Sequence, residues 1–131
     1  ADQYIECDLQ KILDEFNKHD GGMLTFRSTH PKNSFAKIKD DVVIEVAEKK
    51  PISEDATVGL YHWKTGKDYV KYAEQMIKKN IRVNNEFYVC PVFNEAILDK
   101  KRIIIDPVDE MHGLGTPDDL NNFLNIKSKL I

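Results

Sequence analysis

A glutamate and a lysine stand side by side at positions 48 and 49, where a β-branched stretch, 42–49, comes to its end. Ligands of α/β proteins commonly bind at strand ends. The Lys49 ammonium can hold a phosphate there as a point charge, and the Glu48 carboxylate can order a hydroxyl or the lysine. The pair predicts either a site for a phosphorylated ligand or an exposed charged turn.

A second group of polar side chains lies in 83–97, VNNEFYVCPVFNEAI. Asn84, Asn85, Glu86 and Asn94 surround an aromatic, helix-forming core. Amide and carboxylate side chains supply the donors and acceptors that carbohydrate hydroxyls need. The segment predicts either a hydroxyl-binding site beside an aromatic ring or a capped helix with polar ends.

The stretch HGLGTPDDL, 112–120, reads as a helix start. Thr116 is a suitable N-cap, Pro117 suits the first helical position, and acids follow in the first turn. Gly113 and Gly115 allow a sharp turn or the close approach of a bulky group. The stretch is either a plain joint between loop and helix or the edge of a ligand site.

The elements that position these groups alternate between helix and strand, which predicts an α/β or α+β architecture with a mixed sheet. Asp20-Gly21-Gly22 is expected to end the first helix, and Asp40-Asp41 to form a hairpin turn. In the helix that Thr65 caps, we expect Tyr69, Tyr72, Ala73, Met76 and Ile77 to share one face. The predicted helices are 8–19, one from Thr65, 88–98, and one from Pro117 to Leu124 or beyond; the predicted strands are 23–28, 34–40, 42–49, 56–63 and 101–108.

Composition limits the class of protein. With 131 residues, 41% hydrophobic and 31% charged, the chain suits one soluble globular domain or a piece of one. The net charge of −3 argues against a nucleic-acid partner, and no apolar run approaches the roughly 18 residues of a membrane span. Cys7 and Cys90 are expected to be free, buried or semi-buried thiols in a reducing cytoplasm. We therefore expect a cytoplasmic protein.

Common catalytic patterns are missing from the sequence. The four histidines, His19, His30, His62 and His112, have no neighbours that make a Ser-His-Asp triad, and the six glycines form neither GxGxxG nor a Walker pattern. Composition and spacing alone therefore reveal no isolated catalytic site.

Several segments in order carry a family resemblance: EVAEKKPIS, ATVGLYHW, VNNEFYVCPVFNEAI and GLGTPDDL. Together they resemble the C-terminal half of bacterial sugar-phosphate nucleotidyltransferases of capsule and lipopolysaccharide sugar pathways, over nearly the whole chain. The resemblance implies an α/β fold with a mixed sheet flanked by helices, the C-terminal part of a Rossmann-like nucleotidyltransferase domain. Residues 1–131 would then form its sugar-phosphate-binding half.

The implied enzyme activity joins a nucleoside triphosphate (NTP) and a sugar 1-phosphate. An oxygen of the sugar phosphate attacks the α-phosphorus and releases pyrophosphate, with Mg²⁺ bridging phosphates. By resemblance, Asp2 binds the metal and is catalytic, while Lys49 is catalytic and meets the sugar phosphate. Glu48 is the partner of that lysine, and Gly59 lies in a strand that passes under the sugar, where a side chain would collide with the ring.

The remaining implied roles concern sugar hydroxyls and the second metal contact. Glu86 matches an acid that binds hydroxyls, with Asn85 and Asn94 as helpers. Many relatives carry a metal-binding aspartate two residues before the glycine of the GTP tripeptide, where this chain has Gly113. His112 and Asp109 are the candidate substitutes.

The resemblance also implies an incomplete enzyme. The family's N-terminal Gly-rich loop with Arg and Lys, which cradles the triphosphate, is missing, and the chain begins without Met. We therefore expect a fragment that is inactive alone and that binds its missing half or self-associates. The alternatives are a non-catalytic α/β binding or pairing module, and a nucleotidyltransferase for another phosphorylated small metabolite.

Overall fold

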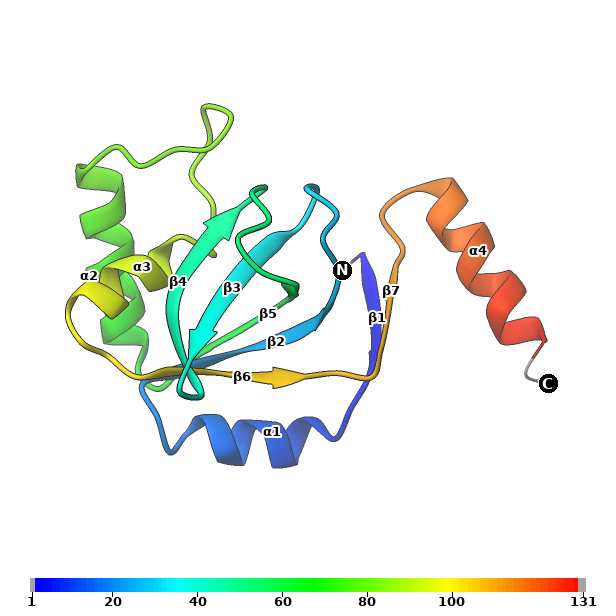
Figure 1. The fold of residues 1–131 in the computed structure, drawn as a ribbon, viewed down its shortest axis with the longest axis horizontal. Helices are drawn as coiled ribbons and strands as arrows, with labels where there is room; N and C mark the ends of the chain where they lie inside the picture. Colours follow the sequence, from blue (N-terminus) through cyan, green and yellow to red (C-terminus); the bar gives the residue numbers. More distant parts are fainter. Residues whose placement is uncertain (1, 130–131) are drawn as a thin grey trace.

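A computed structural model describes residues 2–129 and shows a mixed five-stranded sheet in the order β4-β3-β5-β2-β6 (Figure 1). β2 and β6 run parallel, and the other neighbours in this sheet run antiparallel. β1 and β7 form a separate antiparallel ribbon. The strands are β1 (Gln3–Glu6), β2 (Gly21–Arg27), β3 (Ser34–Lys39), β4 (Val42–Glu48), β5 (Asp55–Trp63), β6 (Ile103–Pro107) and β7 (Glu110–Gly113); the helices are α1 (Leu9–Phe16), α2 (Gly66–Lys78), α3 (Val92–Leu98) and α4 (Pro117–Ser128).

Helices cover both faces of the sheet, which confirms the predicted fold class. Along β2, Met23 packs into the core beneath α2 and α3, whereas the next residue, Leu24, packs into the core that contains the buried side chains of α1. In the same way, Ile103 of β6 packs into the core beneath α2 and α3, and Ile104 packs into the core that contains the buried side chains of α1. This alternation follows from the period of two in a strand and gives a helix–sheet–helix sandwich.

Helix starts agree with their predicted caps. Asp8 Oδ1 accepts a hydrogen bond from the backbone N–H of Lys11 at 3.1 Å, and Thr65 Oγ1 accepts one from Asp68 at 3.2 Å. These bonds satisfy donors that the first turn leaves unpaired. Two helices are shorter than predicted: α1 ends at Phe16, and the segment predicted as 88–98 becomes helical only at Val92.

The two glycines expected to end the first helix belong to β2 instead. An added Cβ at Gly22 would lie 2.3 Å from the ring of Phe16, and one at Gly21 would lie 2.9 Å from the carbonyl oxygen of His62. The glycines therefore make room for close packing rather than for a turn. The Phe16 ring, fully buried, anchors α1 on the sheet.

The hairpin of β3 and β4 turns as predicted. Asp40 and Asp41 have φ values of 53° and 65°, the left-handed conformation that a two-residue type I′ turn requires at both positions. The hairpin places Glu48 at the end of β4 and Lys49 just beyond it.

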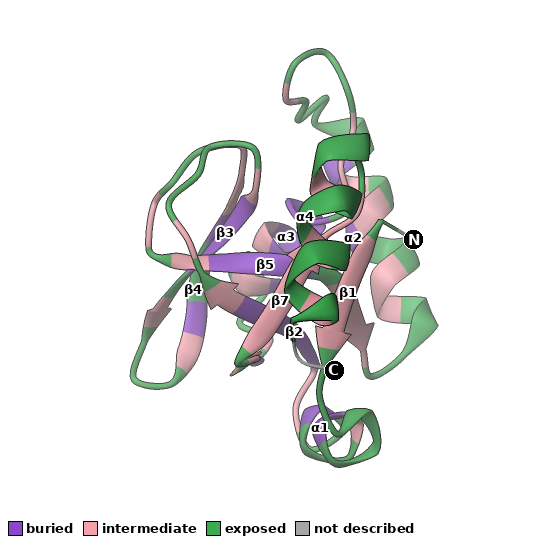
Figure 2. Ribbon diagram, turned by 90° about the vertical axis from the view of Figure 1, so that its right-hand side faces the viewer, coloured by how far each residue is buried: buried purple, intermediate pink, exposed green. Residues whose placement is uncertain are grey.

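The sequence did not predict the β1–β7 ribbon. α4 packs against this ribbon and projects from the rest of the chain (Figure 1), and most of its residues are exposed (Figure 2). Lys127 Nζ reaches Glu6 Oε1 at 3.0 Å and Glu110 Oε1 at 2.9 Å, and both carboxylates raise the pKa of this lysine. No residue of α4 is buried. Ile77 of α2, predicted to share a face with Tyr72 and Met76, is 51% exposed, whereas those two side chains are buried.

Within residues 2–129, none of the helices combines the length and the apolar character that crossing a membrane demands.

Candidate functional site

Two adjoining pockets contain several of the predicted site residues. The first, here called the strand pocket, has a volume of about 270 Å³ and is lined by Ser34, Glu48, Thr57, Gly59, Tyr61, Tyr88 and their neighbours. The second, here called the carboxylate pocket, has a volume of about 410 Å³ and is lined by Asp2, Ser28, His30, Gly113, Gly115, Asp119 and their neighbours. Gln3, Lys32 and Asn33 line both pockets, so the two adjoin through these residues.

Glu48 supplies the carboxylate of the strand pocket. Its side chain is only 10% exposed, and burial raises its pKa, an effect that the nearby Lys49 charge opposes. Lys49 has a left-handed φ of 59°, and its Nζ lies 3.9 Å from Glu48 Oε1. The ammonium also lies 5.3 Å from the centroid of the Tyr88 ring, within the range of a cation–π contact. Lys49 thus lies beside the pocket, next to two residues that line it.

Gly59 opens one side of the strand pocket. Its backbone N–H donates to Gln3 Oε1 at 2.7 Å. A Cβ at this position would lie 2.9 Å from that same oxygen. The missing side chain therefore leaves space both for Gln3 and for the pocket.

Three hydroxyl groups form a connected floor under the strand pocket. The Tyr61 hydroxyl lies 3.0 Å from Ser34 Oγ and 2.8 Å from Thr57 Oγ1, and Ser34 and Thr57 also hydrogen-bond to each other. Burial raises the pKa of Tyr61, and it raises the pKa of the Cys90 thiol to about 12. Both groups therefore stay protonated near neutral pH, which makes the floor polar but uncharged.

The cysteines are both free, as predicted, but Cys7 is exposed rather than buried or semi-buried. Cys90 is buried at the floor of the strand pocket, where its protonated thiol is a poor nucleophile.

The loop before α3 brings Glu86 to the same region. Asn84 and Asn85 adopt left-handed φ values of 49° and 64°, and Val83 and Glu86 exchange two backbone hydrogen bonds of 2.9 Å across this turn. The nearby Glu86 carboxylate raises the pKa of Tyr88. Glu86 is therefore close to Tyr88, a wall of the strand pocket, but it is exposed, and neither Glu86 nor Asn85 lines either pocket.

Asn94 has a different place from the one expected. Its Oδ1 accepts from the backbone N–H of Val46, and its Nδ2 donates to the Val46 carbonyl, both at 2.8 Å. The amide thus ties α3 to β4, and Asn94 lines neither pocket. The role of Asn94 as a helper in ligand binding stays a prediction.

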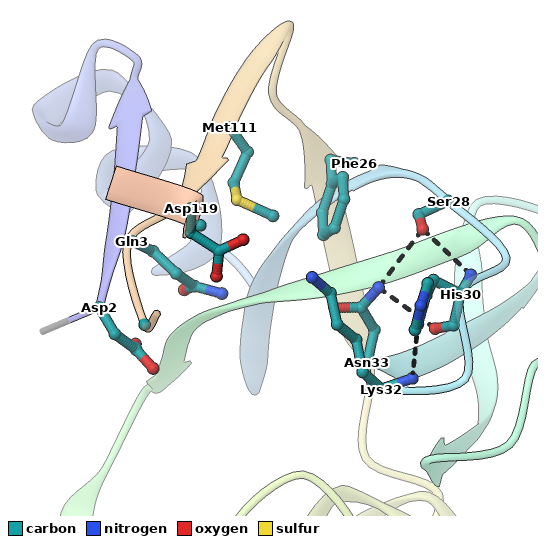
Figure 3. A pocket seen from close by; sticks show the side chains of 11 residues that line it. Asp2, Gln3, Phe26, Ser28, His30, Lys32, Asn33, Met111 and Asp119 are labelled. Atoms are coloured by element: carbon teal, nitrogen blue, oxygen red, sulfur yellow. Dashed lines mark hydrogen bonds between the residues drawn. The ribbon is translucent and has the colours of Figure 1, made fainter. Parts of the chain in front are cut away.

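Asp2 and Asp119 face the carboxylate pocket from opposite ends of the chain (Figure 3). Asp119 Oδ2 lies 3.6 Å from the site of a Cβ on Gly113, and Asp2 Oδ2 lies 3.4 Å from that of a Cβ on Gly115. The two carboxylates therefore lie against the glycine-containing loop, and α4 begins immediately after it.

The expected substitutes for an acid at position 113 lie elsewhere. His112 Nε2 is 2.8 Å from Glu110 Oε1, and Asp109 lines a separate hollow beside Asp106. Asp119, which the sequence analysis did not single out, is the carboxylate next to Gly113. Among residues 2–129, no cluster of three or more His, Cys, Asp or Glu side chains is arranged to hold a metal ion.

The loop between β2 and β3 also lines the carboxylate pocket, and the sequence analysis did not identify it as part of the site. Ser28 Oγ accepts from the backbone N–H of His30 at 3.2 Å and from Asn33 Nδ2 at 3.3 Å, and Lys32 N–H donates to His30 Nδ1 at 3.1 Å. The Asn33 carbonyl accepts from the backbone N–H of Lys49 at 2.8 Å. In the sequence, this loop is marked only by a run of polar residues after a strand, and such runs are common in loops that bind nothing.

Comparisons with solved structures give this fold a context. The nucleoside-diphosphate-sugar pyrophosphorylase from Vibrio cholerae RC9 is 26% identical, with a TM-score of 0.77 over 95% of this chain and 53% of that one. A protein from Bacillus anthracis in complex with sucrose, named for glucose-1-phosphate thymidylyltransferase activity, is 20% identical, with a TM-score of 0.69 over 95% and 51%.

The chain thus has a sugar nucleotidyltransferase-like fold and spans about half the length of these two structures. No protein-family model matches it, and a search of curated proteins finds no match.

Proposed function

We propose that this chain forms the sugar-phosphate-binding side of a nucleotidyltransferase. The complete reaction would transfer a nucleoside monophosphate from an NTP to a sugar 1-phosphate and release pyrophosphate. One observation carries the proposal: a pocket with a buried carboxylate, hydroxyls and an aromatic wall opens beside a pocket with two further carboxylates. The likeness to the Vibrio pyrophosphorylase supports the same class of reaction.

The strand pocket suits a sugar ring. The Glu48 carboxylate, and the Glu86 carboxylate at the rim, can accept hydrogen bonds from sugar hydroxyls. Tyr88 offers an aromatic face, and Gly59 leaves room for the ring to lie close to β5. Lys49, already oriented over the Tyr88 ring, supplies a positive charge for the phosphate.

The carboxylate pocket suits Mg²⁺ by its donors. Magnesium commonly takes one or two protein carboxylates and completes its shell with water and substrate phosphates. Asp2 and Asp119 would hold the ion. When bound, the ion neutralises phosphate charge during transfer.

The triphosphate would bind mainly to residues that this sequence does not contain. Residues 1–131 hold no glycine-rich phosphate loop. We therefore expect no turnover by this chain alone, with the complementary half as its natural partner. By the same resemblance, the sugar nucleotide formed would serve capsule or lipopolysaccharide synthesis from the cytoplasm.

Calorimetric titration with glucose 1-phosphate and other sugar 1-phosphates tests the binding step. We expect at least one to bind more tightly than inorganic phosphate, and Lys49→Ala to weaken it. Lys50→Ala is the matched control, because Lys50 is exposed and, unlike Lys49, has neither an ion pair with Glu48 nor a cation–π contact with Tyr88. If no sugar 1-phosphate exceeds inorganic phosphate, the proposed function is wrong.

A non-catalytic pairing module is the competing function, and α4 is the observation that favours it. Leu120, Leu124 and Ile126 are 43%, 52% and 44% exposed on this helix. Leu120 and Leu124 are four residues apart and so share one face of the helix, and apolar side chains grouped on one face are typical of a surface that another chain covers. Light scattering on the pure protein measures self-association, and sugar 1-phosphate binding distinguishes the two functions.

A further inference from the structure

Lys32 lies at the junction of the two pockets. Of the three residues that line both, Gln3 and Asn33 carry neutral amides, and Lys32 alone carries a charge. Asp2 and Asp119 line one of these pockets, and Glu48 lines the other. Lys32 is thus the one charged residue that lines both pockets, and each pocket contains at least one carboxylate.

The ammonium of Lys32 is directed into the carboxylate pocket. In Figure 3 its side chain extends from the loop toward the side of the pocket that holds Gln3 and Asp119. Lys49 pairs with Glu48, whereas Lys32 forms no ion pair with a carboxylate of residues 2–129. Its charge is therefore available to an anionic ligand.

The backbone that carries Lys32 is held in place from both sides. Its own N–H donates to His30 Nδ1 at 3.1 Å, and the neighbouring Asn33 carbonyl accepts from Lys49 N–H at 2.8 Å. The second bond connects the loop to the end of β4. One backbone hydrogen bond therefore joins Lys49 to the residue that follows Lys32.

A phosphate at this junction would satisfy the charges around it. Unpaired carboxylates repel an anion unless a cation lies nearby, and lysine binds phosphate as a compact point charge. We propose that Lys32 binds the phosphate of the sugar phosphate, as a second cation beside Lys49, with the sugar in the strand pocket. Because this role rests on the proposed function, the test must separate the two.

Calorimetric titration of the 131-residue chain with glucose 1-phosphate, pyrophosphate and glucose provides that test. Lys32→Ala should weaken glucose 1-phosphate binding roughly tenfold, a change equivalent to one charged contact of about 1.4 kcal/mol. Lys32→Arg should keep most of the affinity. Glucose, which carries no phosphate, should bind wild type and Lys32→Ala alike.

Lys37→Ala is the matched control, because this substitution removes the same charge and Lys37 is exposed on β3 and lines neither pocket. Unchanged glucose 1-phosphate binding by Lys32→Ala would refute the role of Lys32 but not the proposed function. A loss confined to pyrophosphate would also refute it, because Lys32 would then serve the triphosphate. A wild-type chain that binds neither glucose 1-phosphate nor any other sugar 1-phosphate would overturn both.

Discussion

A methyl group at Gly59 tests whether the strand pocket holds a sugar. An added Cβ would lie 2.9 Å from Gln3 Oε1 and 3.8 Å from Gln3 Cδ, and no other atom lies within 4 Å. Because Gln3 can rotate away, Gly59→Ala should lose at most its hydrogen bond, about 0.5–1.5 kcal/mol. Replacing glycine within a strand returns roughly 0.5–1 kcal/mol. The free energy of unfolding should therefore change by less than about 1 kcal/mol.

The effect on binding should be much larger than the effect on stability. The methyl group would occupy space in the strand pocket that the sugar ring needs. One surplus or missing carbon in a fitted pocket changes affinity by about 10- to 200-fold. We expect Gly59→Ala to weaken glucose 1-phosphate binding within that range.

The assay pairs urea unfolding, followed by the fluorescence of the single tryptophan, with calorimetric titration of glucose 1-phosphate. Gly66→Ala is the control, because Gly66 is the first residue of α2 and an added Cβ there would have no atom within 4 Å. It should stabilise the fold by up to about 1 kcal/mol and leave binding unchanged. If folded Gly59→Ala binds glucose 1-phosphate as tightly as wild type, the sugar does not lie against β5.

Three further predictions concern stability, pH and metal. Gly22→Ala should destabilise the fold by about 1–3 kcal/mol in urea, because its methyl group overlaps a buried aromatic ring; an unchanged midpoint would contradict this packing. The raised pKa of Glu48 means that folding loses stability as pH rises from the ordinary carboxylate range through that pKa. Glu48→Gln should therefore gain thermal stability relative to wild type at neutral pH and not in acid, while glucose 1-phosphate binding weakens. Asp119→Ala, but not Asp118→Ala, should weaken Mn²⁺ binding measured by electron paramagnetic resonance, and adding Gly113→Asp should restore it; equal affinities in all variants would exclude Asp119 as a ligand.

Local signals made part of this fold predictable. Asp8, Thr65 and Thr116 each accept a hydrogen bond from a backbone N–H three residues later, so capping residues marked the helix starts correctly. Asp40-Asp41 likewise identified the hairpin, because few residues adopt left-handed φ values in succession. These features depend on neighbours in sequence alone.

Features that depend on distant contacts were missed. β1 and β7 are four residues each, and Tyr4 pairs with His112, far along the chain. Gly22 looked like a helix stop because nothing local indicates that the Phe16 ring would pack against it. Short strands and interior glycines acquire their meaning from tertiary packing, which a single sequence does not display.

The candidate site divides in the same way. The resemblance named Glu48 and Gly59, which line one pocket, and Asp2, which lines the next. It could not indicate Asp119, whose approach to Gly113 depends on the direction in which α4 leaves the loop. Lys32 was missed for a related reason, since a lysine in a polar loop has no distinguishing local pattern.

The most direct test of sugar-phosphate binding is a titration of glucose 1-phosphate into the ¹⁵N-labelled chain, followed by amide chemical shifts. We expect saturable shifts that cluster at Lys32, Lys49, Gly59 and Tyr88, with inorganic sulfate producing none at Gly59. Shifts absent from these amides at saturating ligand, or confined to a different face of the sheet, would contradict a sugar-phosphate site in the strand pocket.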